Sequence, residues 1–267
     1  MELKASKPVA LITGASSGIG KSFATLLAKG EVLEPHDLVL VARNQQKLES
    51  LADDFKEQFS TNSQIIVADL CTSEGINLVK GRINADKEPI DLLVNNAGFE
   101  ISGEFSELSE DEIIDQIKLN VIALTLLMHA AIKQMSRRGK GYILNVSSIA
   151  GFTAAPKSAT YCATKAFVTL LSESVSMELK SSGVVLTTLC PGFTRTEFQE
   201  RAGIIRDTIP NFLWQDPDTV AKEGLKGLRD NKFLVIPGTH NKLAYWAVKL
   251  TPTSVVKSVA KFATERL

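Results

Sequence analysis

Short apolar runs alternate along the chain with longer stretches whose apolar residues recur every three or four positions. The short runs are nearly continuous in Val, Ile and Leu, which is typical of strands buried on both faces of a parallel sheet. About seven strands are therefore expected, at residues 9–13, 37–42, 64–68, 90–95, 141–147, 184–190 and 233–237.

The longer stretches between these runs have the periodicity of helices that bury one side. They are expected at residues 19–29, 45–59, 73–86, 110–137, 158–180 and 217–228. A regular alternation of strand and helix predicts an α/β fold with one doubly wound, mostly parallel sheet and helices on both faces. No linker-like composition or short repeat interrupts the pattern, so residues 1–267 are expected to form a single domain.

Residues 191–216, "PGFTRTEFQERAGIIRDTIPNFLWQD", leave this alternation and mix large apolar side chains with charges. They follow a predicted strand directly. Open α/β sheets bind ligands beyond the carboxyl ends of their strands, so this segment is expected to line a substrate pocket. A surface loop with a few buried anchors is the alternative.

The tail, residues 241–267, holds five basic residues against a single acid, Glu265. Val255, Val256, Val259 and Phe262 form an apolar stripe at helical spacing within it. A helix docked on the domain or on another subunit is favoured over a membrane-surface anchor, which is the other arrangement that such a stripe allows.

Composition narrows the range of functions. Thirty basic and thirty acidic residues cancel, so no overall field attracts nucleic acid. The three cysteines, Cys71, Cys162 and Cys190, lack metal-ligand spacing, and no metal is expected. The first residues do not resemble a signal peptide, and no segment approaches the roughly 20 apolar residues of a membrane-spanning helix. A cytoplasmic location is therefore expected.

The sequence "TGASSGIG", residues 13–20, joins the first strand to the first helix. Gly14, Gly18 and Gly20 permit a tight turn and allow backbone N–H groups to approach a phosphate. The helix that begins near Ile19 directs the positive end of its dipole at the same point. Glycines at this place, after a first strand and before a helix, indicate a dinucleotide-binding loop.

Two tyrosine–lysine pairs have the spacing of one helical turn, Tyr161 with Lys165 and Tyr245 with Lys249. A strand that ends in hydroxyls, "NVSS", precedes the first pair, and Ser148 lies thirteen residues before Tyr161. The end of a strand and the following helix can bring these two side chains together. No comparable strand precedes Tyr245. Tyr161 is therefore the catalytic candidate, and Tyr245 is expected to serve in packing.

The first pair suits the reduction of a carbonyl group. A free tyrosine has a pKa near about 10, and a neighbouring ammonium is expected to lower it. A second donor is needed to hold the carbonyl oxygen while charge develops on it, and Ser148 can supply that hydrogen bond.

Five motifs stand in one order along the chain: "TGASSGIG", "NNAG", "NVSS", "YCATK" and "PG". In this order and spacing the chain resembles the short-chain dehydrogenase/reductase family from about residue 9 to residue 196. The resemblance implies a Rossmann-like domain, a nicotinamide cofactor and hydride transfer between an alcohol and a carbonyl. It also implies a homodimer or homotetramer.

The resemblance further implies roles for four residues. Tyr161 is the general acid in reduction and the base in oxidation, and Ser148, rather than Ser147, orients the substrate. Lys165 binds the nicotinamide ribose and tunes Tyr161. Asn120 helps to hold a water of a proton relay near the lysine; from the residues alone, Asn120 is a polar side chain in an apolar helix that needs a partner.

The same resemblance assigns the cofactor to the glycine loop, to the ends of the second, third and fourth strands, to the catalytic helix and to the segment after the sixth strand. For Asp69 a capping role is the alternative, and for Thr194 a role within its loop. The residues expected to bind the cofactor are Gly14, Ser16, Ser17, Gly18, Ile19, Gly20, Arg43, Asn44, Asp69, Leu70, Asn96, Ala97, Gly98, Tyr161, Lys165, Pro191, Gly192, Thr194 and Thr196.

The end of the second strand favours NADP(H) over NAD(H). A carboxylate at this point would bind the ribose hydroxyls of NAD and repel a 2′-phosphate. The chain has Ala42, Arg43 and Asn44 here, and no acid before Glu49. A guanidinium can hold a phosphate through two hydrogen bonds. The alternative is that Arg43 is a solvated surface residue.

The expected substrate is apolar, such as a 3-oxoacyl chain, a steroid-like ketone, or a long-chain or aromatic aldehyde or ketone. The apolar residues of the pocket segment carry this expectation: Phe193, Phe198, Ile204, Ile205, Phe212, Leu213 and Trp214. Arg195, Arg201 and Arg206 would suit an acidic or thioester substrate, unless they are solvated. An NADP(H)-dependent carbonyl reductase or alcohol dehydrogenase is thus predicted, and a catalytically silent NADP(H)-binding sensor or scaffold is the alternative.

Overall fold

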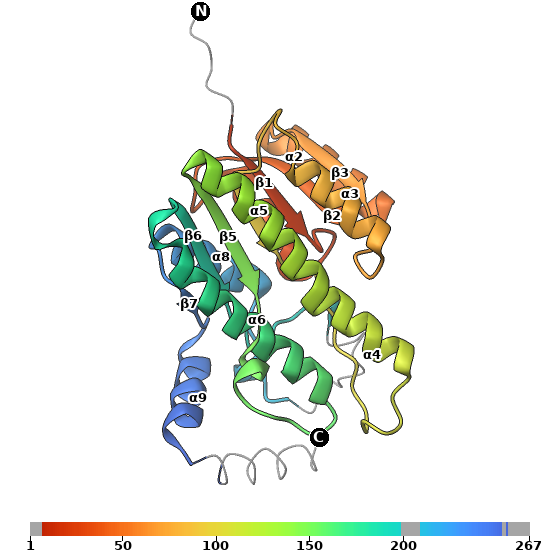
Figure 1. The fold of residues 1–267 in the computed structure, drawn as a ribbon, viewed down its shortest axis with the longest axis vertical. Helices are drawn as coiled ribbons and strands as arrows, with labels where there is room; N and C mark the ends of the chain where they lie inside the picture. The colour runs from red at the N-terminus through yellow and green to blue at the C-terminus, as the bar shows by residue number, and fades with distance from the viewer. Residues whose placement is uncertain (1–6, 199–208, 253–254, 256–267) are drawn as a thin grey trace, which may run out of the picture.

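The structure is a computed structural model that describes residues 7–198, 209–252 and 255. Seven parallel strands form one sheet in the order β3-β2-β1-β4-β5-β6-β7 (Figure 1). The strands are β1 (Val9–Thr13), β2 (Asp37–Ala42), β3 (Ser63–Val67), β4 (Leu92–Asn95), β5 (Gly141–Val146), β6 (Val184–Leu189) and β7 (Leu234–Val235). The predicted doubly wound α/β fold is confirmed.

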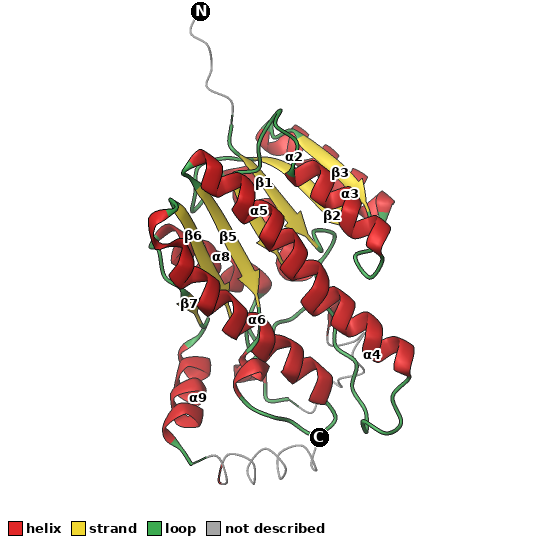
Figure 2. Cartoon of the chain, in the orientation of Figure 1, coloured by secondary structure: helices red, strands yellow, loops and turns green. Residues whose placement is uncertain are grey.

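Helices cover both faces of the sheet, as Figure 2 shows by colour. The α-helices are α1 (Gly18–Lys29), α2 (Gln45–Phe59), α3 (Ser73–Ile83), α4 (Glu110–Ile117), α5 (Leu124–Arg138), α6 (Ala159–Glu178), α8 (Pro217–Arg229) and α9 (Thr239–Leu250). Shorter helical segments are η1 (Lys118–Ala123), η2 (Ile149–Phe152), η3 (Leu179–Ser181) and η5 (Asn211–Leu213).

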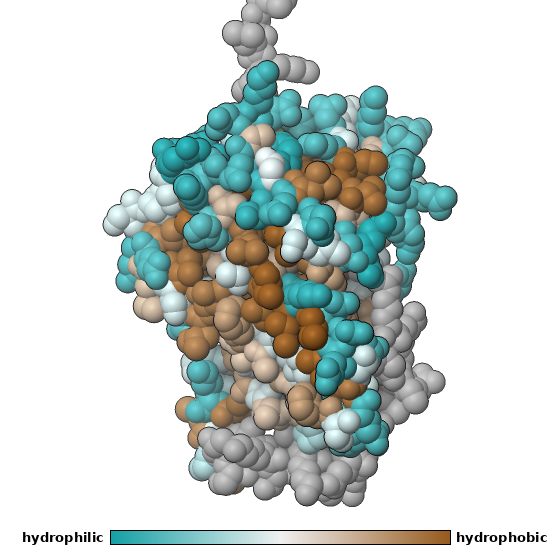
Figure 3. Space-filling view, turned by 45° about the vertical axis from the view of Figure 1, so that its right-hand side comes forward, coloured by the Kyte–Doolittle hydropathy of each residue, from teal (hydrophilic) through white to brown (hydrophobic). Residues whose placement is uncertain are grey.

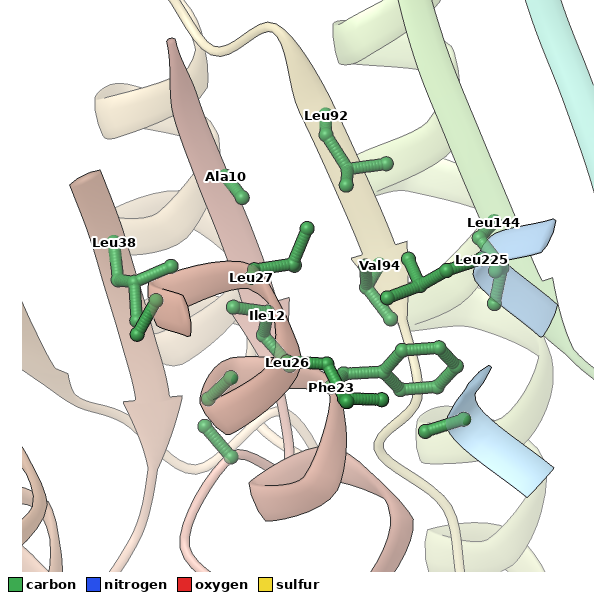
Figure 4. Close-up of a cluster of buried hydrophobic side chains, with 14 of the residues drawn as sticks. Ala10, Ile12, Phe23, Leu26, Leu27, Leu38, Leu92, Val94, Leu144 and Leu225 are labelled. Atoms are coloured by element: carbon green, nitrogen blue, oxygen red, sulfur yellow. The ribbon is translucent and has the colours of Figure 1, made fainter. Parts of the chain in front are cut away.

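Two apolar layers hold the sheet between its helices. On one face Ile12 of β1 packs with Phe23 of α1 and Leu225 of α8 (Figure 4). On the other face Leu11 packs in a second cluster, with residues of α3 and α5 such as Val79. Successive residues of a strand point to opposite faces, so burial of both faces explains why β1 reads as an unbroken apolar run.

The strand order determines where a crevice forms at the carboxyl edge of the sheet. The strand β1 lies between β2 and β4, so the chain moves outward in opposite directions from this point. Loops that follow strands on either side of such a reversal diverge and leave a crevice at the carboxyl edge of the sheet. The loops after β1 and β4 contain the glycine motif and the "NNAG" motif.

The expected helix at residues 110–137 is continuous but irregular, because a π-helical turn, η1, separates α4 from α5. By length and composition this helix, residues 110–138, is the one helix of the described residues that could cross a membrane. That differs from the expectation that no segment approaches the apolar content of a membrane-spanning helix. Leu127 and Met128 of α5 are buried in the core under the sheet, which accounts for the apolar character of that side.

The outer side of α4, α5 and α6 is also apolar. In the view of Figure 3, hydrophobic side chains gather in a band between hydrophilic areas. The exposed members on these helices and η1 are Ile114, Ile117, Ile122, Leu126, Phe167, Leu170 and Met177, of which Leu170 is the most exposed at 66%.

The described part of the tail forms α9. Leu243, Trp246 and Leu250 lie on its outer side and are 71%, 57% and 80% exposed. Of the apolar stripe predicted further on, only Val255 is described, and it is exposed. Val256, Val259 and Phe262 lie outside the described residues.

Candidate active site

The loops after β1 to β6 line one cleft of about 860 Å³ at the carboxyl edge of the sheet. Pockets for small molecules and cofactors commonly have such volumes. Of the residues that sequence analysis assigned to cofactor binding or catalysis, all but Gly20 and Asn120 line this cleft. The motifs, which are scattered along the chain, therefore meet in one place.

The glycine loop has the backbone that its sequence predicted. Gly14 and Gly18 have φ of +67° and +53°, values that side chains disfavour. Ser17 is the N-cap residue of α1, and its side chain makes no capping hydrogen bond. Gly20 lies behind the loop: a Cβ there would stand 2.2 Å from the Gly14 carbonyl oxygen. Its role is close packing of α1 on the loop, not contact with the cleft.

Asn96 ties the loop after β4 to the loop after β1. Its amide Nδ2 donates to the carbonyl oxygens of Thr13 at 2.9 Å and Gly14 at 3.3 Å. In return, the Thr13 hydroxyl accepts the backbone N–H groups of Asn96 and Ala97, both at 3.0 Å. These bonds fix the two loops on which the cofactor motifs lie.

The far end of the cleft, after β2 and β3, is polar and partly exposed. Arg43 is exposed and lines the cleft. Asn44 caps α2 by accepting the Lys47 N–H at 2.9 Å. Lys47 also lines the cleft, where its ammonium pairs with Glu197 at 3.2 Å. Sequence analysis missed Lys47; its place in the first turn of the helix that follows Arg43 and Asn44 was the available signal.

The hydrogen bonds of Asp69 show whether it caps the helix α3. Its Oδ1 accepts the N–H of Cys71, two residues on, at 2.9 Å. The N-cap of α3 is instead Thr72, whose hydroxyl accepts the Gly75 N–H at 3.0 Å. Asp69 thus shapes the turn after β3 while it lines the cleft, and it does not cap the helix.

Ser148, Tyr161 and Lys165 meet at the near end of the cleft. Tyr161 is 8% exposed, and Phe198 packs beside it with ring centroids 5.8 Å apart. The Ser148 hydroxyl accepts the Ala150 N–H at 3.1 Å, and hydrogen bonding with Ser148 acts to lower the pKa of Tyr161. The Lys165 ammonium donates to the Val146 carbonyl oxygen at 3.0 Å and lies 5.7 Å from the centre of the Tyr161 ring.

Burial governs the titration of this group. It raises the pKa of Tyr161 well above the ordinary value, and the charge of Glu100 acts in the same direction. Burial also lowers the pKa of Lys165 to about 8. The expected lowering of the tyrosine's pKa by the lysine is therefore not met in this structure, because loss of hydration on burial raises that pKa.

Asn120 lies behind the wall of the cleft, in the π-helical turn. Its side chain makes a two-way contact with the backbone of Phe99, accepting the N–H at 3.1 Å and donating to the carbonyl oxygen at 2.9 Å. It also donates to the Thr164 hydroxyl at 3.2 Å. It is near the lysine, since a Cβ on Gly98 would lie 3.0 Å from the Asn120 Oδ1 and 3.4 Å from the Lys165 Nζ.

Only some residues of the segment expected to line the substrate pocket line the cleft; others pack elsewhere or face solvent. Phe198 lines the cleft, whereas Phe193 and Trp214 pack on each other at 5.7 Å, and Phe212 points to solvent. Arg195 bonds to Asn211 at 3.3 Å. Leu213 is part of η5 and does not line the cleft. Ile204, Ile205, Arg201 and Arg206 lie outside the described residues.

The second tyrosine–lysine pair is away from the cleft. Tyr245 packs edge-on against Phe152 with ring centroids 4.6 Å apart, and it does not line the cleft. Its helix is nevertheless anchored to the site by buried Asn241, which donates to Pro237 and Gln215 at 2.8 and 2.9 Å. A Cβ on Gly192 would lie 2.5 Å from the Oδ1 of Asn241. Sequence analysis missed this anchor.

The chain matches the short chain dehydrogenase family over residues 8–204 and belongs to it. It is similar to a short-chain dehydrogenase from Sphingobium yanoikuyae solved with NADPH, at 36% identity and a TM-score of 0.83, covering 91% of this chain and 92% of that one. It is also similar to a bulky-bulky ketone specific alcohol dehydrogenase from Comamonas testosteroni, at 32% identity and a TM-score of 0.78, covering 92% and 94%.

Relatives known by sequence point to the same class. A very-long-chain 3-oxoacyl-CoA reductase of Anas platyrhynchos is 31% identical over 94% of this chain and 78% of its own length. The human inactive hydroxysteroid dehydrogenase-like protein 1 is 32% identical, over 70% of this chain and 56% of its own length. The protein is thus an oxidoreductase of a family that uses nicotinamide cofactors.

Proposed function

We propose that the protein is an NADP(H)-dependent oxidoreductase that acts on the carbonyl or secondary alcohol of an apolar substrate. The observation that carries this proposal is the meeting of Ser148, Tyr161 and Lys165 at one end of a cleft whose wall is the glycine loop. The end of the cleft with these three residues can position a reacting carbonyl, and the glycine loop can hold the phosphates of a dinucleotide.

The cleft fits such a cofactor. Gly14 and Gly18 have no side chains and can adopt the left-handed backbone of the loop, and the start of α1 faces the cleft through Ser17, Gly18 and Ile19. Backbone N–H groups at a helix start bind phosphate well. When bound, the nicotinamide donates or accepts the hydride, and the chain's own side chains handle the proton.

In reduction, the Tyr161 hydroxyl gives its proton to the carbonyl oxygen of the substrate, and the Ser148 hydroxyl donates a second hydrogen bond to that oxygen. In oxidation, the tyrosine oxygen takes the proton of the alcohol. Lys165 is placed to stabilise the phenolate, because its ammonium lies over the tyrosine ring. Asn120 fixes the backbone between the cofactor and substrate ends of the wall.

Two observations support NADP(H) over NAD(H). Arg43 and Lys47 both line the cleft after β2, with Asn44 between them in place of an acid. The Sphingobium yanoikuyae relative was solved with NADPH. For the substrate, Phe99, Ile101 and Phe198 give the wall near Tyr161 an apolar character. The names of the relatives, a bulky ketone dehydrogenase and a very-long-chain 3-oxoacyl-CoA reductase, support an apolar ketone.

The test is NADPH consumption by the purified protein with a panel of ketones and aldehydes, from short polar compounds to 3-oxoacyl thioesters and steroid-like ketones. Tyr161→Phe should lower turnover by about 10²- to 10⁴-fold, the usual contribution of a general acid, while NADPH binding persists. Tyr245→Phe is the matched control and should retain turnover. Turnover by Tyr161→Phe close to that of the parent would refute the assignment.

A silent NADP(H)-binding protein is the second candidate, and the name of the human relative favours it. Against it stands the intact set of Ser148, Tyr161 and Lys165 in one cleft. Binding of NADPH without turnover of any carbonyl in the panel is the result that would support this candidate.

A further inference from the structure

Glu100 is a buried acid in the cleft that neither the motifs nor the proposed proton transfer uses. It lies two residues after Gly98, the last residue of the "NNAG" motif, is 9% exposed and lines the cleft. Its position is fixed, because the backbone of the preceding residue, Phe99, is held on both sides by the Asn120 side chain. Buried acids need partners, so the surroundings of this carboxylate bear on function.

The two oxygens of the Glu100 carboxylate differ. The Oε1 atom accepts the hydroxyl of Ser158 at 2.7 Å. Within the described part of the chain no hydrogen bond reaches Oε2, and this atom is not among those wholly sealed from solvent. Glu100 lines the cleft, so this acceptor is available to a molecule bound there. A donor on a bound molecule could therefore complete the hydrogen bonding of the carboxylate.

The carboxylate stands at the substrate end of the cleft. Ser158 directly precedes α6 and lies three residues before Tyr161. Burial is the main cause of the shifted pKa of Tyr161 and of Lys165, and the charge of Glu100 acts to raise both values, so it is felt at both side chains. Burial raises the pKa of Glu100 itself, and the Ser158 hydrogen bond and Lys165 oppose that rise. Apolar side chains, Phe99, Ile101 and Phe198, make up the neighbouring wall.

The geometry points to Glu100 as a binding residue for a hydrogen-bond donor carried by the substrate. The preferred substrates would then be apolar ketones, or the matching alcohols, that bear a hydroxyl or amino group a few atoms from the reacting carbon. Ketones with a carboxylate at that place would be rejected by like charge. This inference rests on the proposed carbonyl chemistry and narrows its substrate class.

The experiment compares binding of matched ketones in a complex that cannot react. With NADP⁺ bound, a ketone finds no hydride, so calorimetry measures binding alone. The probes are phenyl ketones with a tertiary hydroxyl group, which NADP⁺ cannot oxidise, two to five carbons from the carbonyl, each paired with its methyl ether, which lacks the donor. A second series replaces the hydroxyl by an amine, and a third by a carboxylate. The proteins are the parent, Glu100→Gln and Ser158→Ala.

A hydrogen bond to a charged acceptor is worth about 1.5–3 kcal/mol, or roughly a tenfold to hundredfold difference in affinity. At the best chain length the parent should therefore bind the hydroxyl or amino ketone at least tenfold more tightly than the ether. Glu100→Gln should bring that ratio close to one, because its amide turns a donor toward the cleft. Ser158→Ala should weaken both members of a pair alike and keep the ratio.

A parent that does not distinguish the hydroxyl ketone from its ether at any chain length overturns the inference. A Glu100→Gln protein that keeps the affinity ratio of hydroxyl ketone to ether also overturns it, because Glu100 would then serve only to hold Ser158 in place. A parent that shows the ratio but fails to consume NADPH with the same ketones would instead refute the proposed reduction and leave the binding role of Glu100 intact. The amine and hydroxyl series together decide which donor fits better.

Discussion

Substitution of Gly20 by alanine is expected to damage both the fold and the cofactor loop. The added Cβ would stand 2.2 Å from the Gly14 carbonyl oxygen and 2.5 Å from the Asn96 amide nitrogen. Real Cβ atoms do not come this near to other atoms, so α1 must move away from the loop. The Asn96 hydrogen bonds to Thr13 and Gly14 would then lengthen or break.

The magnitude follows from these two effects. Overpacking costs about 1–3 kcal/mol, and each weakened hydrogen bond adds about 1 kcal/mol. We expect a loss of roughly 3 kcal/mol in the free energy of unfolding, which for a chain near this size lowers Tm by about 6–12 °C. NADPH affinity should fall as well, because the displaced Gly14 carbonyl belongs to the loop that lines the cleft.

The matched control is Gly81→Ala in α3. A Cβ at Gly81 would meet no atom within 4 Å, and the residue lies in a regular helix. Alanine there should raise stability by about 0.5–1 kcal/mol and leave NADPH binding unchanged. Thermal melts and NADPH fluorescence titrations of the two variants measure both quantities. A Gly20→Ala protein with the parent's Tm and NADPH affinity would refute the reasoning about close packing.

Three further predictions concern the cofactor, the outer apolar face and α9. Arg43→Ala should weaken NADPH by about tenfold to a hundredfold, the worth of a hydrogen bond to a charged group, and NADH far less; equal weakening in binding titrations contradicts a phosphate contact. The outer face of α4, α5 and α6 is expected to be covered in a homodimer or homotetramer. Leu170→Glu should then lower the mass measured by light scattering, Leu243→Glu on α9 should not, and a monomeric parent contradicts the expectation. If α9 touches anionic membranes, vesicles of anionic lipid should shift the tryptophan emission of the parent to shorter wavelength and leave that of Trp246→Phe unshifted, because Trp214 is buried; an unshifted parent contradicts the contact.

The sequence allowed the sheet to be predicted well because its inner strands, such as β1, are buried on both faces. A short, unbroken apolar run such as β1 packs against the apolar clusters on both faces of the sheet, and this pattern is typical of a central parallel strand. The ends of strands were less predictable. The last strand was expected at residues 233–237 but is only Leu234–Val235, since β7 pairs with the edge of β6 through two residues, Thr188 and Leu189. The length of a strand is set by its partner, which the chain itself does not reveal.

The arrangement of the cleft could also be predicted in part. Motifs that follow strands of a parallel sheet meet at one edge, so most of the expected residues line one cleft. Asn120 and Gly20 do not line it, because both lie behind the residues that form its wall. The position of Asn120 depends on the π-helical turn, and that of Gly20 depends on the close approach of α1 to the glycine loop. Glu100 and Lys47 were missed, since only the path of a loop and a helix turns their side chains toward the cleft.

The Asn241 anchor has a consequence for how the carboxyl-terminal region can be altered. The side chain fills the space behind Gly192 and joins Pro237 to Gln215. A chain cut after Leu250 keeps this support. A chain cut before Asn241 would leave a hollow beneath the segment that carries Thr194 and Thr196. The support of the cleft therefore reaches into α9, well past the last family motif.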